Sequence, residues 1–247
     1  MTDCIKIERI TKRYPGATAD SLCGVDLSVK VGDKYGVLGP NGAGKTTLIS
    51  ILCGLFGQSS GRIFYWGEEP VGVTKELQQR LGYVPQEYAF YHELTPLQNL
   101  EYFAAMCKLE KEVIKSRSSD ILQRLGLFDV RNKKVGTFSG GMKRRMNLAI
   151  GIIHEPDVLF LDEPTVGVDV QSKMAIMRLL NELNEKGTTI IYTSHHLDEA
   201  QEFCNRIALI DNGAIIANGD TNALLAQHEA TDLKELLIKL TGESYRD

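Results

Sequence analysis

The stretch "KYGVLGPNGAGKTT", residues 34–47, decides how this chain folds. Its first six residues form a short apolar run of the kind that makes a buried strand. A glycine-rich turn follows at once, and "TLISILCGL" (47–55) behind it is helical in character. Residues 39–46 match G-x-x-x-x-G-K-[ST], placed between a strand and a helix as phosphate binding requires. The stretch therefore predicts an α/β fold with a phosphate loop.

The chemistry of this loop indicates a nucleoside triphosphate with Mg²⁺. Its glycines let backbone N–H groups curl round the β-phosphate, and the helix N-terminus adds its dipole. Lys45 is placed to reach the β and γ oxygens, and the Thr46 hydroxyl to complete a Mg²⁺ shell. Kinases and GTPases carry the same loop, so the loop leaves the use of the energy open. We assign nucleotide binding to Gly39, Pro40, Asn41, Gly42, Ala43, Gly44, Lys45, Thr46 and Thr47.

Outward from the loop, β-branched runs alternate with helical patterns, which is typical of a parallel sheet flanked by helices. The runs at 157–162 and 188–194 fit central parallel strands, with a helix at 170–186 between them. Two earlier runs, 4–10 and 24–29, alternate apolar with polar residues and predict antiparallel, half-exposed strands.

One segment, from about 94 to 154, contains three successive helical patterns and no strand pattern. We expect an inserted helical subdomain there, and a C-terminal helical tail at about 220–247. With 247 residues, the chain is expected to form a single domain, 1–247, with an N-terminal antiparallel β subdomain.

Two adjacent acids end the apolar run "VLFLDEP" (158–164). Asp162 is placed to hold Mg²⁺ directly or through water, and Glu163 to orient or deprotonate an attacking water. Taken alone, the pair could be two acids at an exposed strand end; the upstream loop favours the catalytic interpretation.

Other polar residues follow predicted strands or turns, and each is a weak signal by itself. Gln86 follows "LGYVP", Asp169 follows "PTVGV", and His195 follows "TTIIYTS" with His196 beside it as an alternative. Tyr14, in "TKRYPG", is either a nucleobase-stacking ring or an ordinary surface tyrosine in a turn.

The run "TFSGGMKRRMNLAI" (137–150) predicts a second anion site. Ser139 is a good N-cap, and Gly140 and Gly141 leave the first N–H groups of the helix unshielded. A chain with a complete phosphate loop has no obvious need for a second one, unless it binds the nucleotide of a second copy. Two subunits placed head to tail would then enclose two ATP molecules in an isologous arrangement. The alternative is simply a capped helix, with Lys143, Arg144 and Arg145 on a solvated face.

Five motifs in order, "GPNGAGKTT", "VPQE", "FSGGM", "LFLDEPTVGVD" and "TSHHLDEA", resemble the nucleotide-binding subunits of ABC transporters. The resemblance runs from Tyr14 to about residue 220. It implies the ABC ATPase form of the P-loop NTPase fold, with a RecA-like core sheet. Phe138 and Met142 depart from the usual Leu-Ser-Gly-Gly-Gln signature, and the "MKRRMNLAIGIIHEP" continuation resembles exporter ATPases with separate ABC-2-type permeases.

The resemblance also implies residue roles. Tyr14 would stack on adenine, and Gln86 would sense Mg²⁺ and the transmembrane partner. Glu163 would be the catalytic base and His195 the switch histidine at the γ-phosphate, while Asp169 would lie in the loop that crosses the dimer. The expected catalytic residues also include Lys45 and Gln86. The expected Mg²⁺ ligands are Thr46, Gln86 and Asp162. The expected nucleotide-binding residues also include Ser139, Gly140, Gly141 and Asp169.

Composition sets limits on the partners. The formal charge of −4 argues against a nucleic-acid binder, and five scattered cysteines without a C-x-x-C pair fit a reducing compartment. The longest uncharged run, 46–61, is too short to span a bilayer. We therefore expect a cytoplasmic protein, attached to the cytoplasmic face of the cell membrane through a separate permease.

The sequence thus predicts the ATP-binding subunit of an ABC exporter, working as a dimer that is expected to be a homodimer. The alternative is a soluble ABC-type ATPase that acts on ribosomes or DNA, although this chain has neither a second cassette nor a coiled-coil or zinc insertion. The aromatic segment 87–95, with Tyr88 and Phe90, is the candidate permease surface, or else local packing.

Overall fold

The computed structural model describes residues 2–72 and 74–242. Two compact units divide the chain: unit 1 contains residues 1–75 and 189–247, and unit 2 contains residues 76–188. The last five residues of the predicted C-terminal tail, 243–247, lie outside the described residues.

The N-terminal part of unit 1 is an antiparallel sheet of order β2–β1–β4. Its strands are β1 (Asp3–Lys12), β2 (Leu22–Lys30) and β4 (Ser60–Tyr65), and the first two pair antiparallel. Burial in β2 alternates from Val25 to Val29, as expected for a sheet with one face on the core. The predicted antiparallel strands are confirmed, whereas β4 was not predicted.

The remaining strands of unit 1 surround β3 (Lys34–Leu38), which is buried from Tyr35 onward. It pairs in parallel with β7 (Thr189–Ser194) on one side and with β8 (Arg206–Asp211) on the other. β8 turns back into β9 (Ala214–Asp220) as an antiparallel hairpin. The predicted strands at 34–39 and 188–194 are confirmed.

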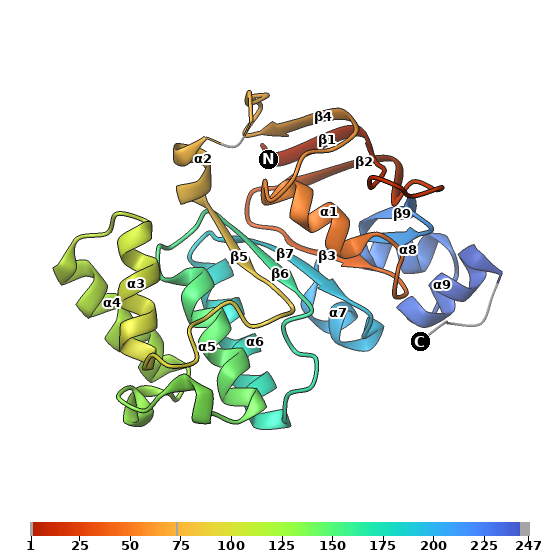
Figure 1. Cartoon of the computed structure of the whole chain (residues 1–247). Coiled ribbons are helices and arrows are strands. Elements are labelled where there is room, and N and C mark those ends of the chain that lie inside the picture. Colours follow the sequence, from red (N-terminus) through yellow and green to blue (C-terminus); the bar gives the residue numbers. More distant parts are fainter. Residues whose placement is uncertain (1, 73, 243–247) are drawn as a thin grey trace. The chain divides into compact units, whose positions relative to one another are not determined.

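Four helices of unit 1 complete its described part (Figure 1): α1 (Lys45–Leu52), α7 (Leu197–Phe203), α8 (Thr221–Gln227) and α9 (Leu233–Thr241). α8 and α9 each begin with an aspartate whose carboxylate accepts a hydrogen bond from a first-turn N–H group. Both helices lie in the C-terminal tail that the sequence predicts to be helical.

Unit 2 has a parallel pair of strands, β5 (Leu81–Val84) and β6 (Val158–Asp162). Every residue of β6 is buried, which explains why its first four residues are apolar, and Asp162 is the buried carboxylate that ends it. The helix α2 (Lys75–Arg80) precedes β5, and the long helix α6 (Val170–Glu185) follows β6.

Three helices lie between those strands in the sequence: α3 (Pro96–Met106), α4 (Lys111–Arg124) and α5 (Gly140–Ile152). They occupy the three positions where the sequence predicts helices, and two 3₁₀ turns, Phe128–Val130 and Val135–Thr137, lie before α5. Thr95 and Gln98 form a capping box that fixes the start of α3. The division of this region as a subdomain at 94–154 stays a prediction.

Candidate functional site

The phosphate loop of unit 1 runs from the end of β3 to the start of α1. Gly44 is the N-cap of α1 and has φ of 108°, a left-handed conformation that glycine adopts without strain. A Cβ at this position would also lie 2.7 Å from the carbonyl oxygen of Ser21. No side chain caps α1. The first N–H groups of the helix therefore remain suited to an anion.

Lys45 is buried, with 6% of its surface exposed, and its side chain turns back over the loop. Its Nζ donates hydrogen bonds to the carbonyl oxygens of Gly39 (2.8 Å) and Pro40 (3.0 Å). The loop thus holds its own cation over the turn. A positive charge beside a helix N-terminus is a combination that suits the β- and γ-phosphates of a nucleotide.

Tyr14 lies at the edge of the same unit and is 38% exposed. Its hydroxyl is 3.2 Å from the Thr47 Oγ1, which ties the tyrosine to the first turn of α1. The Phe56 ring meets it edge to face at 5.8 Å, and Lys12 Nζ lies 5.6 Å from its ring centroid. An aromatic ring held beside the phosphate loop is able to stack on a nucleobase.

His195 follows β7 at the same edge of the strands as the phosphate loop. In the parallel pairing, Leu38 aligns with Ser194, so Gly39 and His195 are the next residues on neighbouring strands. The ring of His195 stacks against His196 with centroids 4.2 Å apart; His195 is half-buried, whereas His196 is exposed. The register favours His195 over His196 as the residue that faces a nucleotide.

Unit 2 contains the acidic pair. Asp162 is 1% exposed at the end of β6, and Glu163 is 6% exposed with φ of 49°. A non-glycine residue in this region of φ is uncommon and is often found at functional sites. Gln86 Nε2 donates a hydrogen bond to Glu163 Oε2 at 3.2 Å. The parallel register explains this contact, because Val84 aligns with Leu161 and both side chains follow two residues later.

The helix α5 begins at the sequence pattern that predicts a second anion site. Ser139 is its N-cap, and the Ser139 Oγ accepts a hydrogen bond from Met142 N at 3.3 Å. Ser139 and Gly140 are exposed, whereas Gly141 is buried. A Cβ at Gly141 would lie 2.3 Å from Ser172 Oγ and 2.5 Å from Asp169 Oδ2. Glycine is required there because α6 begins in direct contact.

Asp169 is the N-cap of α6. Its carboxylate accepts hydrogen bonds from Ser172 N (2.8 Å) and Ser172 Oγ (2.9 Å). These bonds to the charged form hold the pKa of Asp169 below its usual value. The contact with Gly141 brings Asp169 and the start of α5 together.

Two functional candidates of unit 2, Arg144 and Asn147, were not predicted from the sequence. Arg144 is only 5% exposed and Asn147 only 2%, so the prediction of a solvated basic face is wrong for Arg144. Both side chains hydrogen-bond to the backbone of residues 85–89, the segment that carries Gln86. Their spacing of three on one helix is the only signal in the sequence, and it does not reveal the partner.

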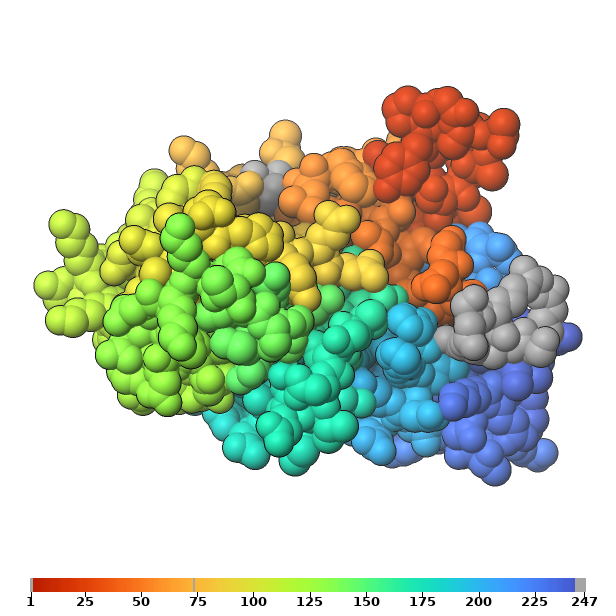
Figure 2. Space-filling view, turned by 60° about the horizontal axis from the view of Figure 1, so that its bottom comes forward, coloured from red at the N-terminus to blue at the C-terminus, as the bar shows by residue number. Residues whose placement is uncertain are grey.

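The aromatic segment 87–95 has both exposed and buried side chains. Yellow parts of the chain, the colour of this stretch of the sequence, reach the molecular surface in Figure 2. Tyr88 is 38% and Tyr91 48% exposed, whereas Phe90 is only 8% exposed. Phe90 stacks on Tyr88 at 5.4 Å and meets the ring of His92 at 5.0 Å. Phe90 therefore supports the segment from inside and does not belong to a contact surface.

The structure thus assembles two groups of predicted residues, one in each unit. Unit 1 contains the phosphate loop, Tyr14 and His195, and unit 2 contains Gln86, the acidic pair, the start of α5 and Asp169. Within the described residues, no helix is long and apolar enough to cross a membrane.

A family model described as "ABC transporter" matches residues 22–166. The chain belongs to the ABC transporter family. This ABC chain is 39% identical to the linearmycin resistance ATP-binding protein LnrL of Bacillus subtilis, over 98% of this chain and 77% of the relative. It is 40% identical to the daunorubicin resistance ATP-binding protein DrrA3 of Streptomyces coeruleorubidus, over 97% of this chain and 75% of the relative.

A solved dimeric ATP-binding cassette, bound to ADP and phosphate in a post-hydrolysis state, superimposes on this ABC chain with a TM-score of 0.80. The identity is 26%, and the match covers 87% of this chain and 98% of the other. The predicted fold class is confirmed: this is the ABC form of the P-loop fold, and the chain is an ATP-binding subunit with ATPase activity.

Proposed function

We propose that this subunit closes head to tail on a second copy when ATP binds, reopens on hydrolysis, and so drives a separate membrane permease for export. One observation carries the proposal. The chain already has a complete phosphate loop, and α5 adds a second, serine-capped helix N-terminus at which Ser139 and Gly140 are exposed. A second copy is the source of nucleotide that fits an isologous dimer.

In this proposal the phosphate loop and Lys45 bind the β- and γ-phosphates, and Tyr14 stacks on the adenine. Ser139 and the N–H groups of Gly140 and Gly141 approach the γ-phosphate bound to the partner subunit. Dimer closure then depends on ATP, since ADP lacks the group that this second site contacts.

Glu163 acts as general base. Its carboxylate is 6% exposed and held by Gln86 at 3.2 Å, so it is kept in one place for an attacking water. His195 is assigned to the γ-phosphate, and Asp169, fixed by its two bonds from Ser172, to the loop that meets the partner subunit.

The residues fit Mg²⁺, which prefers oxygen ligands and keeps several waters. Asp162 of unit 2 offers a buried carboxylate at the end of β6. The family resemblance assigns Gln86 and Thr46 to the same ion, and their side chains offer an amide oxygen and a hydroxyl. No group of three or more His, Cys, Asp or Glu side chains that could hold a metal ion occurs in the described residues, so phosphate and water would provide the remaining ligands. When bound, the ion would neutralise charge on the phosphates.

We place the permease contact at the exposed aromatic side chains of unit 2, Tyr88, Tyr91 and Tyr102. Tyr91 and Tyr102 pack edge to face at 5.0 Å and are 48% and 44% exposed. Aromatic side chains are enriched at the centres of protein interfaces. Both relatives are named for resistance to antibiotics, which favours export over import.

The test is Glu163→Gln, which keeps the shape of the side chain and removes the base. Steady-state ATP hydrolysis is expected to fall at least about a hundredfold, while ATP binding is retained. Hydrolysis at the wild-type rate would show that Glu163 is not the base.

The same variant, tagged and purified from detergent-solubilised membranes, tests the partner. A stoichiometric polytopic membrane protein is expected in mass spectrometry of the sample. Ribosomal proteins or DNA in its place, with the chain absent from membranes, would support the soluble alternative and reject the transporter subunit.

A further inference from the structure

Two side chains of α5 hold the backbone of the segment that carries Gln86. Arg144 Nη1 donates to the carbonyl oxygen of Gln86 at 2.7 Å and to that of Pro85 at 3.4 Å. Asn147 Nδ2 donates to the carbonyl oxygens of Pro85 (2.9 Å) and Glu87 (3.4 Å). Asn147 Oδ1 accepts from Ala89 N at 2.9 Å. These bonds reach four of the five residues from 85 to 89.

The burial of Arg144 shows that these bonds are not incidental. A buried guanidinium is costly, because water no longer solvates its charge. Burial lowers the pKa of Arg144 here, although the charges of Tyr88, Glu163 and Asp162 oppose that shift. An apolar side chain would fill the space without this cost. What the arginine adds is hydrogen bonding to Gln86 and a cation–π contact with Tyr88, whose ring centroid lies 5.3 Å away.

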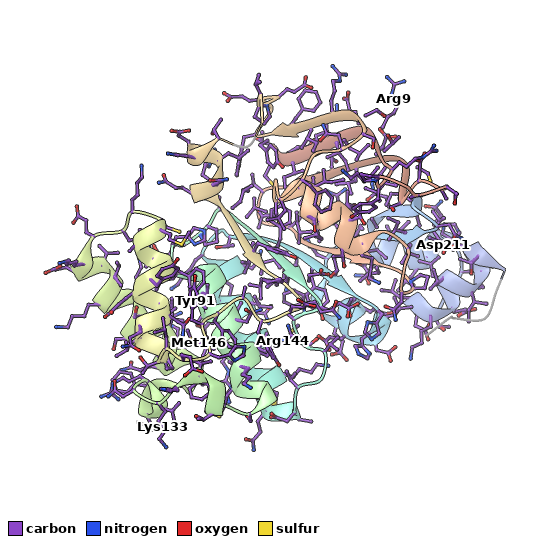
Figure 3. The ribbon with its side chains drawn as sticks, in the orientation of Figure 1. Arg9, Tyr91, Lys133, Arg144, Met146 and Asp211 are labelled. Atoms are coloured by element: carbon purple, nitrogen blue, oxygen red, sulfur yellow. The ribbon has the colours of Figure 1, made fainter. Side chains whose placement is uncertain are left out.

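Arg144 also retains an unused donor. Figure 3 labels Arg144 among the side chains of the molecule. Among the described residues its Nε has no hydrogen-bond partner, although the atom is buried. A buried donor without a partner costs free energy. The position of the Arg144 side chain therefore allows hydrogen bonds to the carbonyl oxygens of Pro85 and Gln86 but leaves one of its own donors unpaired.

The same helix carries the second anion site at its first turn. α5 is continuous from Gly140 to Ile152, with Ser139 as its N-cap, so the second anion site and the two loop-holding side chains belong to one helix. Tyr88 gives a second link, since its hydroxyl donates to the carbonyl oxygen of Gly140 at 3.4 Å. Gln86 in turn contacts Glu163 at 3.2 Å. An unbroken chain of contacts within unit 2 thus joins the start of α5 to the acidic pair.

We propose that Arg144 and Asn147 are positioning residues that fix Gln86 against Glu163 and couple the position of α5 to the catalytic carboxylate. Contact of Ser139–Gly141 with the nucleotide of the partner subunit would then set the geometry of the base in this subunit. The inference rests on the proposed function, because it takes Glu163 as the base.

The first test separates positioning from binding. Arg144→Met keeps the length and apolar volume of the side chain and removes its donors. We expect kcat to fall about tenfold, with the Kd for ATP within about twofold of wild type. Arg117→Met is the matched control, because Arg117 also donates to a backbone carbonyl, that of Ile153, but does not reach the 85–89 segment. Its kcat is expected to stay at the wild-type value.

A double-mutant cycle with Gln86→Ala distinguishes this role from a general effect on packing. If Arg144 acts through Gln86, Arg144→Met lowers kcat about tenfold in wild type but less than about twofold in the Gln86→Ala background. An equal loss in both backgrounds would overturn the proposal. So would a wild-type kcat for Arg144→Met.

A second variant keeps the proposal testable if Arg144→Met does not fold. Arg144→Lys retains the charge but loses the forked geometry, so an intermediate loss with the same dependence on Gln86 is expected. Asn147→Leu is expected to give the same pattern. Failure of the proposed function is recognised separately, since it appears as hydrolysis by Glu163→Gln, whatever Arg144 does.

Discussion

Two helices of this chain begin where a phosphate is expected, α1 in unit 1 and α5 in unit 2, and their first turns are built differently. α1 has a glycine N-cap, no capping side chain and a buried lysine folded over the loop. α5 has a serine cap, two glycines and an exposed start. The first has a lysine bonded to its own loop, whereas the second has a serine cap and two glycines at its start.

This difference predicts that the two helices act at different steps. The phosphate loop before α1, with Lys45 over it, is expected to bind nucleotide in an isolated subunit. The start of α5 is expected to contribute binding energy only when a nucleotide held by another subunit is brought to it. Binding and closure are therefore separable, and substitutions at the two helices are expected to affect different steps.

Lys45→Ala should give the largest effect. It removes the charge that the carbonyl groups of Gly39 and Pro40 hold over the loop, so ATP binding and hydrolysis are both lost, hydrolysis by at least about a hundredfold. Nucleotide binding is measured by titration calorimetry and hydrolysis by phosphate release. Wild-type affinity for ATP in this variant would mean that α1 is not the primary binding site.

Gly141→Ala is expected to destabilise the fold rather than the nucleotide site of α1. Its Cβ would overlap Ser172 Oγ and Asp169 Oδ2, so the free energy of unfolding should fall by about 1–3 kcal/mol in urea denaturation. Gly140→Ala is the matched control, because the nearest atom to its Cβ, the carbonyl oxygen of Gly167, is 3.9 Å away. Equal stability of the two variants would contradict the close contact between α5 and α6.

Ser139→Ala removes the cap of α5 and one donor of the second site. The expected cost in stability is about 1 kcal/mol. The affinity of the isolated subunit for ATP should not change, whereas ATP-dependent dimerisation, followed by light scattering, should weaken. A loss of affinity in the monomer would show that α5 acts on the nucleotide of its own subunit.

The smallest expected effect is on the pH dependence of stability, and it concerns His154, just beyond the C-terminal end of α5. His154 Nε2 donates to the carbonyl oxygen of Leu81 at 3.0 Å, and burial lowers the pKa of His154. The folded state therefore binds this proton less readily than the unfolded state. Its contribution to stability is present above the unfolded pKa of about 6.5 and is lost as pH falls through the folded pKa.

The comparison is with His154→Gln, which does not titrate. Between pH 7 and pH 5, wild type should lose more stability than this variant, by at most about 1.4 kcal/mol per pH unit. Parallel pH profiles in chemical denaturation would show that His154 does not titrate differently on folding.

Local patterns predicted most of the elements near the site. The three helical patterns between 94 and 154 located α3, α4 and α5, and a glycine-rich turn between a strand and a helix located the phosphate loop. The β8–β9 hairpin was missed although its turn, Asn212–Gly213, is a recognisable signal in which both residues have positive φ. Short strand β4 gave no such signal.

Arg144 could not be predicted in the same way. A basic residue beside two others on a helix normally faces water, and its actual partners, the carbonyl oxygens of Pro85 and Gln86, lie more than fifty residues earlier. Backbone acceptors have no side-chain signature. Only tertiary structure shows that this arginine is buried against the loop.

A complementation experiment between two defective variants tests most directly whether two subunits share a nucleotide site. Both variants also carry Glu163→Gln to prevent turnover. One is Lys45→Ala and the other is Ser139→Arg, each confirmed to be folded by circular dichroism. If ATP is enclosed between α1 of one copy and α5 of the other, the mixed dimer contains one intact site. In gel filtration without free nucleotide, the mixture should then elute as a dimer that holds one ATP per two chains, whereas each variant alone should elute as a monomer, although Ser139→Arg binds ATP reversibly. Absence of an ATP-holding dimer from the mixture, or such a dimer formed by Ser139→Arg alone, would contradict a site shared between two subunits.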